Sequence, residues 1–465
     1  MILISNLKNN FGPSNDYKIR LFNIDKQKVY FIYNEVLTNK DQINNLVIRK
    51  ILLLNKRQLK KLDNHIPDIS TIIINEKDIL TYLNNGYLII IYKKNYACEI
   101  KSILDRGITT IESELAFNGP KDSFCETFNT NLGLIRKRIK SCDLYCDNIE
   151  VGRSTKTRIG LLYMNNIVKQ DLVKQIKLVL NKIDIDGIID SSYLKTTLEE
   201  RKNFFPTIMM SERPDKSCMA LLEGKVVILV DTSPYALILP SFFIDFFHTA
   251  DDYYQKRSNA TFIRIVRVLA FLIALFLPAL YISVTTRNYN LVPLPLLLML
   301  KAGRTFVPFP AYIEALFMII CFEILKESDL RVSQVGGSAV SILGGLILGD
   351  AAVAAGIVSP IMIIIIAISS IAGLIFTSQE LVNALRIYKI ALLILSTLLG
   401  IYGVIIGTIL LAYNLLTVKI FGLNYLTTLI PFEKNEIKDS FIKLDSHIKM
   451  RNSFLTKNIV RGKYK

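Results

Sequence analysis

The stretch IRIVRVLAFLIALFLPALYISV, residues 263–284, decides the fold class of the C-terminal half of this chain. No charged residue occurs from Val268 to Thr286, and a helix of that length can cross roughly 30 Å of hydrocarbon. Further uncharged runs follow at 332–349, 351–379 and 390–418. We therefore predict a multi-pass α-helical membrane domain.

The rest of the chain has a different composition. Of 465 residues 51% are hydrophobic, but residues 1–260 mix charged and apolar side chains in the usual way. We predict a soluble N-terminal region of two α/β subdomains, then a membrane domain of about four to six spans, then a short basic tail. The predicted boundaries are 1–117, 118–255, 256–421 and 422–465.

The first subdomain alternates strand-like and helix-like segments. Runs rich in Ile, Val and Tyr, bounded by Asn, Asp or Gly, predict strands at 28–33, 70–75 and 87–92. Apolar residues at helical spacing predict helices at 39–54 and 76–85.

The second subdomain opens with a helix predicted within 118–140, with Asp122 as its cap and basic residues in its last turn. A strand at 156–164, a helix at 169–183 and further strands at 185–190 and 224–231 follow. Strand, helix and strand in this order predict a parallel β-α-β unit.

Several features bear on compartment and partners. Met1–Leu7 is apolar but too short for a signal peptide, so we expect a cytosolic N-terminal region. Six cysteines without a framework-like spacing fit a reducing compartment, and the pair Cys142 and Cys146 lacks a second Cys/His pair for a metal. The net charge of +16 gathers beside the apolar segments and in the tail, which favours anionic lipid over nucleic acid.

We recognise no catalytic motif in the sequence. Residues 151–158, VGRSTKTR, lack the spacing of a phosphate-binding loop and precede a strand instead of opening a helix. His65, His248 and His447 lie in different regions and outside any catalytic motif. We predict no catalytic residue, cofactor or metal, and hence no enzyme.

The predicted spans contain a proline and two acids. Pro278 should kink the first span unless neighbouring helices satisfy the carbonyl that it frees. Residues 290–303 are too short to cross and predict an interfacial or re-entrant segment. In the second span, 306–327, Glu314 and Glu323 are separated by about 900° of helical rotation and should point to opposite sides.

The next segment combines small residues with an acid. Gly337, Ser341, Gly345 and Gly349 recur every fourth residue, which indicates close helix contact in lipid. The stripe is either the packed interior of a bundle or the lining of a narrow pathway. Asp350 should be paired, in water or near an interface, because a charge in hydrocarbon is unfavourable. Glu314, Glu323 and Asp350 are the candidate ion-path acids, and Pro278 is a candidate gating kink.

The last spans leave the topology open. We predict spans at 359–378 and 388–416, the latter containing Gly400, Gly403 and Gly407. A cytosolic N-terminal region and a cytosolic tail require an even number of spans, whereas a plain count gives five. Either 335–378 is re-entrant or the last segment bends.

Between about residues 118 and 430, several long motifs resemble, in order, the A subunit of spore nutrient-germinant receptors, the GerA family. The motifs are VGRSTKTR (151–158), ERPDK (212–216), ALLEGKVVILVDTSPYALILP (220–240), DDYY (251–254), ALFLPALYIS (274–283), VPFPAYIEALFM (307–318), FEILKES (322–328) and GGSAVSILGGLILGDAAVAAGIVSP (336–360). Two positions depart from the family pattern: RVSQVGG (331–337) lacks the expected prolines, and Asp350 replaces a neutral Gln.

The resemblance implies a multi-pass subunit in the inner membrane of bacterial endospores. It implies a transporter-like B subunit that recognises amino-acid or sugar germinants, a lipoprotein C subunit, and an oligomer of A subunits around a germinant-gated cation path. The alternatives are an accessory paralogue of the stage V sporulation AF type, a secondary transporter, and a scaffold that the membrane segments only anchor.

Overall fold

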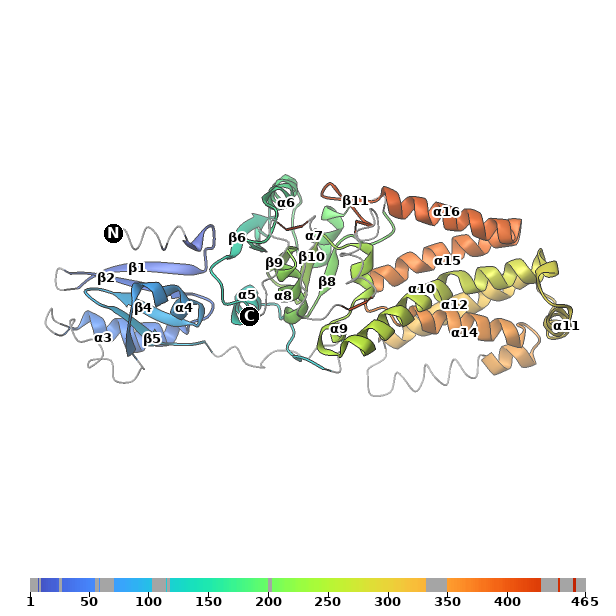
Figure 1. Ribbon diagram of the computed structural model, residues 1–465, viewed down its shortest axis with the longest axis horizontal. Helices are drawn as coiled ribbons and strands as arrows, with labels where there is room; N and C mark the ends of the chain where they lie inside the picture. The colour runs from blue at the N-terminus through green and yellow to red at the C-terminus, as the bar shows by residue number, and fades with distance from the viewer. Residues whose placement is uncertain are drawn as a thin grey trace.

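The structure is a computed structural model, and it describes residues 7, 10–24, 27–54, 58, 71–102, 114, 118–199, 203–331, 349–427, 442–443 and 455–456. The described residues form an N-terminal subdomain, a second subdomain and a helical domain, which follow one another along the long axis (Figure 1).

The N-terminal subdomain is a five-stranded antiparallel sheet with helices on both faces. Its strand order is β1 (Tyr17–Ile24), β2 (Gln27–Asn34), β4 (Tyr87–Ile91), β5 (Asn95–Glu99) and β3 (Thr71–Ile74). The helices are α2 (Lys40–Gln42), which continues through a π-helical stretch (Ile43–Ile48) into α3 (Arg49–Leu52), and α4 (Ile79–Asn84). Alternate residues of β2 enter different cores, Phe31 on the α3 side and Ile32 on the α4 side. The predicted strands of this subdomain are confirmed, while β1 and β5 were not anticipated.

The second subdomain is also built on a five-stranded sheet. The strand order is β6 (Leu144–Val151), β7 (Thr157–Met164), β9 (Val226–Val230), β10 (Ala236–Leu239) and β8 (Met209–Ser211). Helices α5 (Phe128–Arg138) and α8 (Pro214–Leu222) pack on one face. Helices α6 (Gln170–Lys182) and α7 (Ser191–Leu198) cover the other.

Two predictions for this subdomain are wrong. No parallel β-α-β unit forms, because β7 and β9 pair antiparallel, with Ile159 opposite Val230. Residues 185–190 are not a strand; Asp190 caps α7 through the backbone N–H of Ser192, at 3.0 Å. The chain then passes through α7, β8 and α8 and enters β9 from the opposite end of the sheet.

Helix α5 begins later than the sequence predicts. It starts at Phe128, and Asp122 does not cap it. Both carboxylate oxygens of Asp122 instead accept from Arg138 in the last turn, at 2.6 Å. The basic last turn is confirmed, with Arg136, Lys137 and Arg138 at the C-terminal end of the helix dipole.

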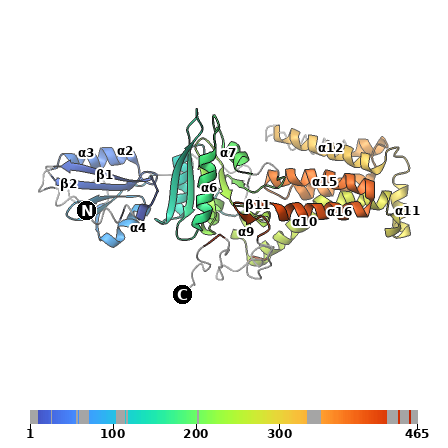
Figure 2. The same cartoon turned by 90° about the horizontal axis from the view of Figure 1, so that it is seen from above.

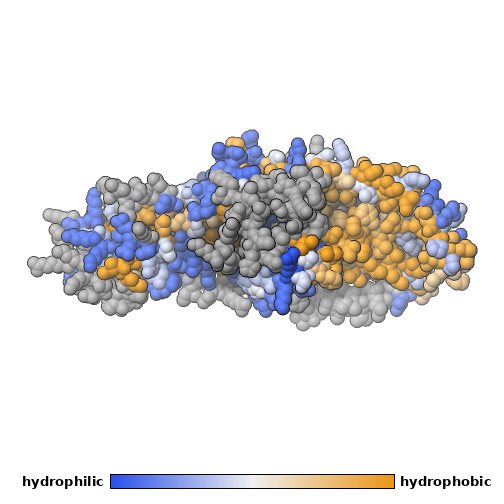
Figure 3. Space-filling view, viewed as in Figure 1, coloured by the Kyte–Doolittle hydropathy of each residue, from blue (hydrophilic) through white to orange (hydrophobic). Residues whose placement is uncertain are grey.

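The C-terminal half is helical. Its helices are α10 (Arg257–Thr286), α11 (Leu294–Ala302), α12 (Ala311–Arg331), α14 (Pro360–Gly373), α15 (Gln379–Leu399) and α16 (Ile401–Thr417). Within the described residues, α10 and α15 are long and apolar enough to cross a membrane by length and composition, and α14 and α16 are shorter apolar helices. Figure 3 shows apolar residues gathered over this domain. The exposed apolar side chains of α10 include Phe262, Leu269 and Leu272.

The predicted last span is two helices joined by a tight turn. Gly400 separates α15 from α16 at φ 63° and ψ −137°, which favours glycine, and a Cβ there would overlap Asn288 Oδ1. At Gly403 a Cβ would overlap the backbone carbonyl of Leu395, so these helices approach closely. The predicted last segment therefore bends at Gly400. α10 begins and α16 ends at the side of the second subdomain (Figure 1).

Candidate functional site

The junction between the second subdomain and the helical domain contains a buried acid between two arginines. Asp252 lies in the short helix α9 (Asp251–Tyr254) and has no exposed surface. Arg267 Nη1 lies 2.7 Å and Arg264 Nε 3.4 Å from Asp252 Oδ2, and both arginines are buried in the first part of α10. Arg267 also donates to Phe247 O at 2.9 Å. The start of α10 is therefore fixed to the second subdomain by charge-assisted hydrogen bonds.

The environment of Asp252 keeps it ionised. Burial alone would raise the pKa of Asp252, but the hydrogen bond from Arg267 and the charges of Arg267 and Arg264 hold that pKa below its ordinary value. One carboxylate thus faces two buried guanidinium groups, and each of the three groups depends on the others for its charge balance.

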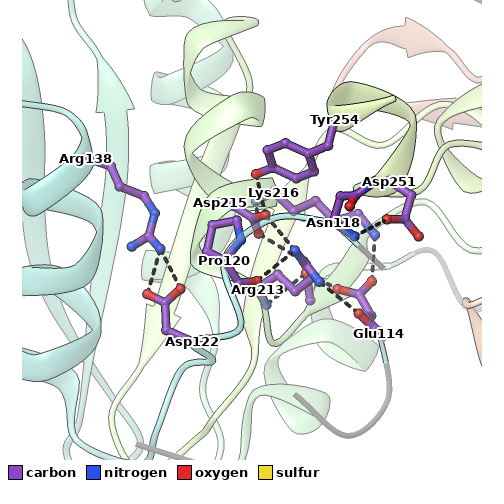
Figure 4. Close-up of polar contacts among 11 residues, drawn as sticks. Glu114, Asn118, Pro120, Asp122, Arg138, Arg213, Asp215, Lys216, Asp251 and Tyr254 are labelled. Atoms are coloured by element: carbon purple, nitrogen blue, oxygen red, sulfur yellow. Dashed lines mark hydrogen bonds and ion pairs between the residues drawn. The ribbon is translucent and has the colours of Figure 1, made fainter. Parts of the chain in front are cut away.

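A second polar cluster lies beside α9 (Figure 4). Arg213, at the N-terminus of α8, holds Asp215 with two hydrogen bonds of 3.0 and 2.7 Å. The Tyr254 hydroxyl donates to Asp215 Oδ2 at 2.7 Å, which connects α8 to α9. Arg213 also donates to the carbonyls of Glu114 and Pro120, at 3.1 and 3.2 Å. These hydrogen bonds connect the chain segment that leads into the second subdomain, which contains Glu114 and Pro120, to α9, the helix that precedes α10.

The same cluster includes Glu114 and Asn118, which belong to the chain segment that leads into the second subdomain. Lys216 Nζ lies 2.6 Å from Glu114 Oε1, and the backbone N–H of Asn118 donates to Asp251 Oδ1 at 3.3 Å. In the sequence, the ERPDK and DDYY motifs resemble those of the family, but no sequence pattern indicates that they are in contact. The alternation of Arg213 and Asp215 is a local signal for an ion pair, but their contact with Tyr254 is non-local.

Helix α15 provides a third attachment. Lys195 of α7, which is buried, forms an ion pair with Glu380 at the start of α15. The ring of Phe205 stacks on Tyr388 of α15, with centroids 5.1 Å apart. One hydrophobic core runs from α5 and α8 through Phe271 of α10 to Leu411 of α16. The second subdomain and the helices therefore pack as one unit.

Glu314 is held by an ion pair and by hydrogen bonds within the helical domain. It lies in the first turn of α12, is buried, and pairs with Arg304 Nη2 at 2.8 Å. Its Oε2 accepts from both the backbone N–H and the hydroxyl of Ser359, each at 3.0 Å. Ser359 is the N-cap of α14, so Glu314 occupies the place where a helix dipole favours an anion.

Glu323 faces a different partner, as the rotation along the helix predicts. Its Oε2 lies 2.6 Å from Arg386 Nη2 of α15, and both side chains are 37% exposed. Asp350 is exposed, and among the described residues beyond its own helix turn and chain neighbours, no atom lies within 4 Å of the position that a Cβ of Gly349 would take. Gly337, Ser341 and Gly345 lie outside the described residues. The structure does not join the three acids in one site.

Pro278 does not interrupt its helix. Helix α10 continues through the proline, and the carbonyl of Ala274, four residues earlier, is left without its helical donor. Ser369 of α14 supplies the missing bond, since its hydroxyl donates to Ala274 O at 2.9 Å. The sequence allowed a kink at Pro278 or a neighbouring helix that satisfies the freed carbonyl, and the structure shows such a neighbouring donor. Ala270, Ala274 and Ala372 pack together beside it, which lets α10 and α14 approach.

Replacing Ser369 by alanine is expected to lower the free energy of unfolding by about 1–3 kcal/mol, because the buried carbonyl loses its donor. In a Pro278→Ala background, residue 278 regains an N–H for that carbonyl, so Ser369→Ala should have little effect there. Thermal unfolding of the four variants in detergent forms a double-mutant cycle that measures this coupling. Ser396→Ala is the matched control, since Ser396 bonds the carbonyl of Leu393 in its own helix. Equal effects of Ser369→Ala in both backgrounds would contradict the assignment.

The described part of the chain contains no group of three or more His, Cys, Asp or Glu side chains that could hold a metal ion. The chemistry of the junction is instead that of ion pairs and helix caps, which position helices.

Comparisons with known proteins give a consistent result. The family model described as Bacillus/Clostridium GerA spore germination protein matches residues 5–453. Spore germination protein B1 of Bacillus subtilis (strain 168) is 31% identical over 95% of the chain and 94% of its own length. Spore germination protein KA of the same organism is 39% identical over 75% of the chain, and the match spans 64% of that relative.

One solved structure is also similar. It is the crystal structure of the N-terminal domain of the A subunit of the Bacillus megaterium spore germinant receptor GerK3, at 28% identity and a TM-score of 0.39. The match covers 52% of this chain and 94% of the solved one.

Proposed function

The chain belongs to the Bacillus/Clostridium GerA family of spore germination proteins, and on this premise we propose that it is an A-type membrane subunit of a nutrient-germinant receptor. The proposal includes a place in the inner membrane of the endospore, with the N-terminal region in the cytosol. It also includes a transporter-like B-type partner and a lipoprotein C-type partner.

The shared core of the second subdomain and the helices supports this role most directly. A receptor subunit must pass a change at one site to another, and coupling needs packed elements that move together. Here the Asp252 cluster and the Lys195–Glu380 ion pair connect the soluble part to α10 and α15. A scaffold that is only anchored by its helices does not require such attachments.

We further propose that several copies assemble around a cation path. The stripe of Gly337, Ser341, Gly345 and Gly349 would face a neighbouring copy or line the path. Asp350, which is exposed in one copy, is the acid best placed to attract cations to it. Glu314 and Glu323, each engaged by an arginine, would shape the path through the helices that they hold. Pro278 is the proposed site of bending.

The test is germinant-triggered cation release from spores of a strain without other members of the family. The strain lacking this gene should not respond to the germinant that the wild-type gene serves. Asp350→Asn should slow the release by up to about tenfold, since it removes a fixed charge that concentrates cations. Asp186→Asn, which removes an exposed acid from the second subdomain, is the control.

The outcomes separate the alternatives. A normal response without the gene contradicts the receptor role. Uptake of labelled germinant by the chain without its partners would identify a secondary transporter. Equal release from wild type and Asp350→Asn contradicts the role of Asp350 in the path, while leaving the receptor role in place.

A further inference from the structure

The described residues of the C-terminal tail beyond residue 427 contact the rest of the chain at two separate places. Lys443 lies against α9 and the start of α10, whereas Leu455 and Thr456 lie beside the start of α6. Helix α6 lies farther from the helical domain than α9 does (Figure 2). One contact is therefore at the junction of the domains and the other is on the second subdomain alone.

Leu455 occupies a place in the core of the second subdomain. Its side chain has no exposed surface and belongs to the apolar cluster on the α6 face of the sheet, together with Leu172 of α6 and Val226 of β9. Burial of a whole leucine side chain is among the larger favourable contributions that one residue makes. The tail is thus inserted into this face of the subdomain instead of lying loosely over it.

The backbone around Leu455 pairs with the chain that leads from β7 into α6. The N–H of Lys169, the N-cap residue of α6, donates to Leu455 O at 2.9 Å. Val168 and Thr456 form an antiparallel β-bridge. Backbone pairing combined with a pocket for one side chain is the way in which proteins recognise an extended segment by strand addition.

Gly224, between α8 and β9, leaves room for the tail. Its φ of +90° favours glycine, and a Cβ at this position would lie 2.5 Å from Thr456 Cγ2. Val168, Lys169 and Gly224, with the core beneath them, form a surface that we call the tail site. Two different connections of the second subdomain therefore contribute to one binding surface.

Lys443 connects the tail to the start of α10. Its Nζ donates to the carbonyls of Tyr253 and Gln255, at 3.2 and 2.6 Å, at the C-terminal end of α9. Its backbone N–H donates to Thr261 Oγ1 of α10, at 3.2 Å. A lysine placed on the last carbonyls of a helix satisfies acceptors that the helix leaves free. The same residue thus holds α9 and α10 together.

We propose that the tail site is a binding site for an extended segment with one apolar side chain, and that the chain's own tail occupies it through Leu455. The docked tail is a strap, because Lys443 on the same segment then holds the start of α10. Two contacts on one chain raise the effective concentration of each other, so release of Leu455 weakens the contact of Lys443. A contact of one side chain and a short backbone pairing opens while the subdomain stays folded.

The test is hydrogen exchange of the full chain in detergent, measured by mass spectrometry. Leu455→Asp should speed exchange about tenfold or more in the peptide that contains Lys169, since the buried leucine no longer closes the contact. Exchange should also rise at residues 257–264, by a smaller factor, because Asp252 still holds α10. β9 should remain protected. The matched control is Ile442→Asp, which places the same acid at an exposed position of the tail and should change neither region.

A peptide of residues 451–460, added to the Leu455→Asp chain, separates binding at the site from the action of the strap. The peptide should restore protection at Lys169 but not at residues 257–264, because it lacks Lys443. The same peptide carrying Leu455→Asp should restore neither. In the otherwise unchanged chain, Lys443→Met should speed exchange at residues 257–264 and leave Lys169 protected.

Each other outcome contradicts a distinct part of the proposal. Unchanged exchange at Lys169 in Leu455→Asp means that the tail does not occupy the site. Faster exchange throughout β9 means that Leu455 is a fixed part of the fold and not a detachable ligand. Unchanged exchange at residues 257–264 means that the tail is no strap. Protection of Lys169 that falls when the wild type is diluted means that the tail of a second copy occupies the site. None of these measurements depends on the receptor role.

Discussion

Replacing Asp252 by alanine is expected to lower the free energy of unfolding by about 3–5 kcal/mol and to abolish the germinant response, because it leaves two buried cations without their acid. Arg267 Nη1 lies 2.7 Å from this carboxylate, and Arg264 is buried beside it. Without Asp252, both guanidinium groups must reach water, which requires the start of α10 to separate from the second subdomain. Thermal unfolding of the purified chain in detergent measures the loss.

Asp251→Ala is the matched control for this variant. The Asp251 carboxylate is more exposed, and within the described part of the chain it accepts one long hydrogen bond, from the Asn118 N–H at 3.3 Å. Its loss should have a small effect on both stability and response. If Asp252→Ala unfolds at the same temperature as Asp251→Ala, the two arginines find other partners, and the cluster does not hold the domains together.

The same cluster predicts a dependence on pH. Because the pKa of Asp252 is lower in the folded chain than its ordinary value of about 4, its contribution to stability is fully present above about pH 4. The contribution is lost as the pH falls through the lower, folded value. Asp252→Asn should remove that part of the acid sensitivity. Unfolding temperatures of both proteins between about pH 3 and pH 6 measure it, and parallel curves would contradict the assignment.

Local sequence patterns were sufficient to predict the features whose physical cause is local. The strands around Phe31 and Ile90 were predictable because their apolar runs are short and bounded by turn residues. The opposite directions of Glu314 and Glu323 follow from helical rotation alone. The two outcomes predicted for Pro278 also have a local cause, since any proline frees the carbonyl four residues earlier.

Non-local causes explain the errors. The run VVILV in β9 is buried on both faces, and such a run reads the same in a parallel or an antiparallel sheet. Asp190 before Ser191 is a capping signal, but the apolar residues just before it also fit a short strand. The positive charge beside the apolar segments predicts contact with anionic lipid, whereas the structure buries two of these cations, Arg264 and Arg267, against Asp252. The sequence contains the three residues but not their contact.

A buried ion pair also connects the N-terminal subdomain to the second subdomain. Arg136 of α5 lies with its Nε 2.8 Å from Asp16 Oδ2, and both side chains are almost fully buried. Asp16 precedes β1 and also accepts from Asn34 Nδ2 at 2.9 Å. The guanidinium lies over the ring of Tyr17, at 5.1 Å from its centroid. The N-terminal subdomain is thus held against α5 by one acid and its neighbours.

Asp16→Ala is expected to lower the free energy of unfolding by about 3–5 kcal/mol, since Arg136 would remain buried without an acid. The N-terminal subdomain should then separate from α5, so that hydrogen exchange of the full chain speeds up in β1 and in α5 but not in α10. Asp184→Ala, which breaks the exposed Arg153–Asp184 pair, should change exchange little. Asp16→Leu combined with Arg136→Met should recover most of the loss, because an apolar pair of similar volume leaves no buried charge. Arg136 Nη1 also donates to the Tyr17 hydroxyl, at 3.4 Å. If the double variant is as unstable as Asp16→Ala, the hydrogen bonds from Asn34 to Asp16 and from Arg136 to Tyr17, and not the charge balance, hold the subdomains together.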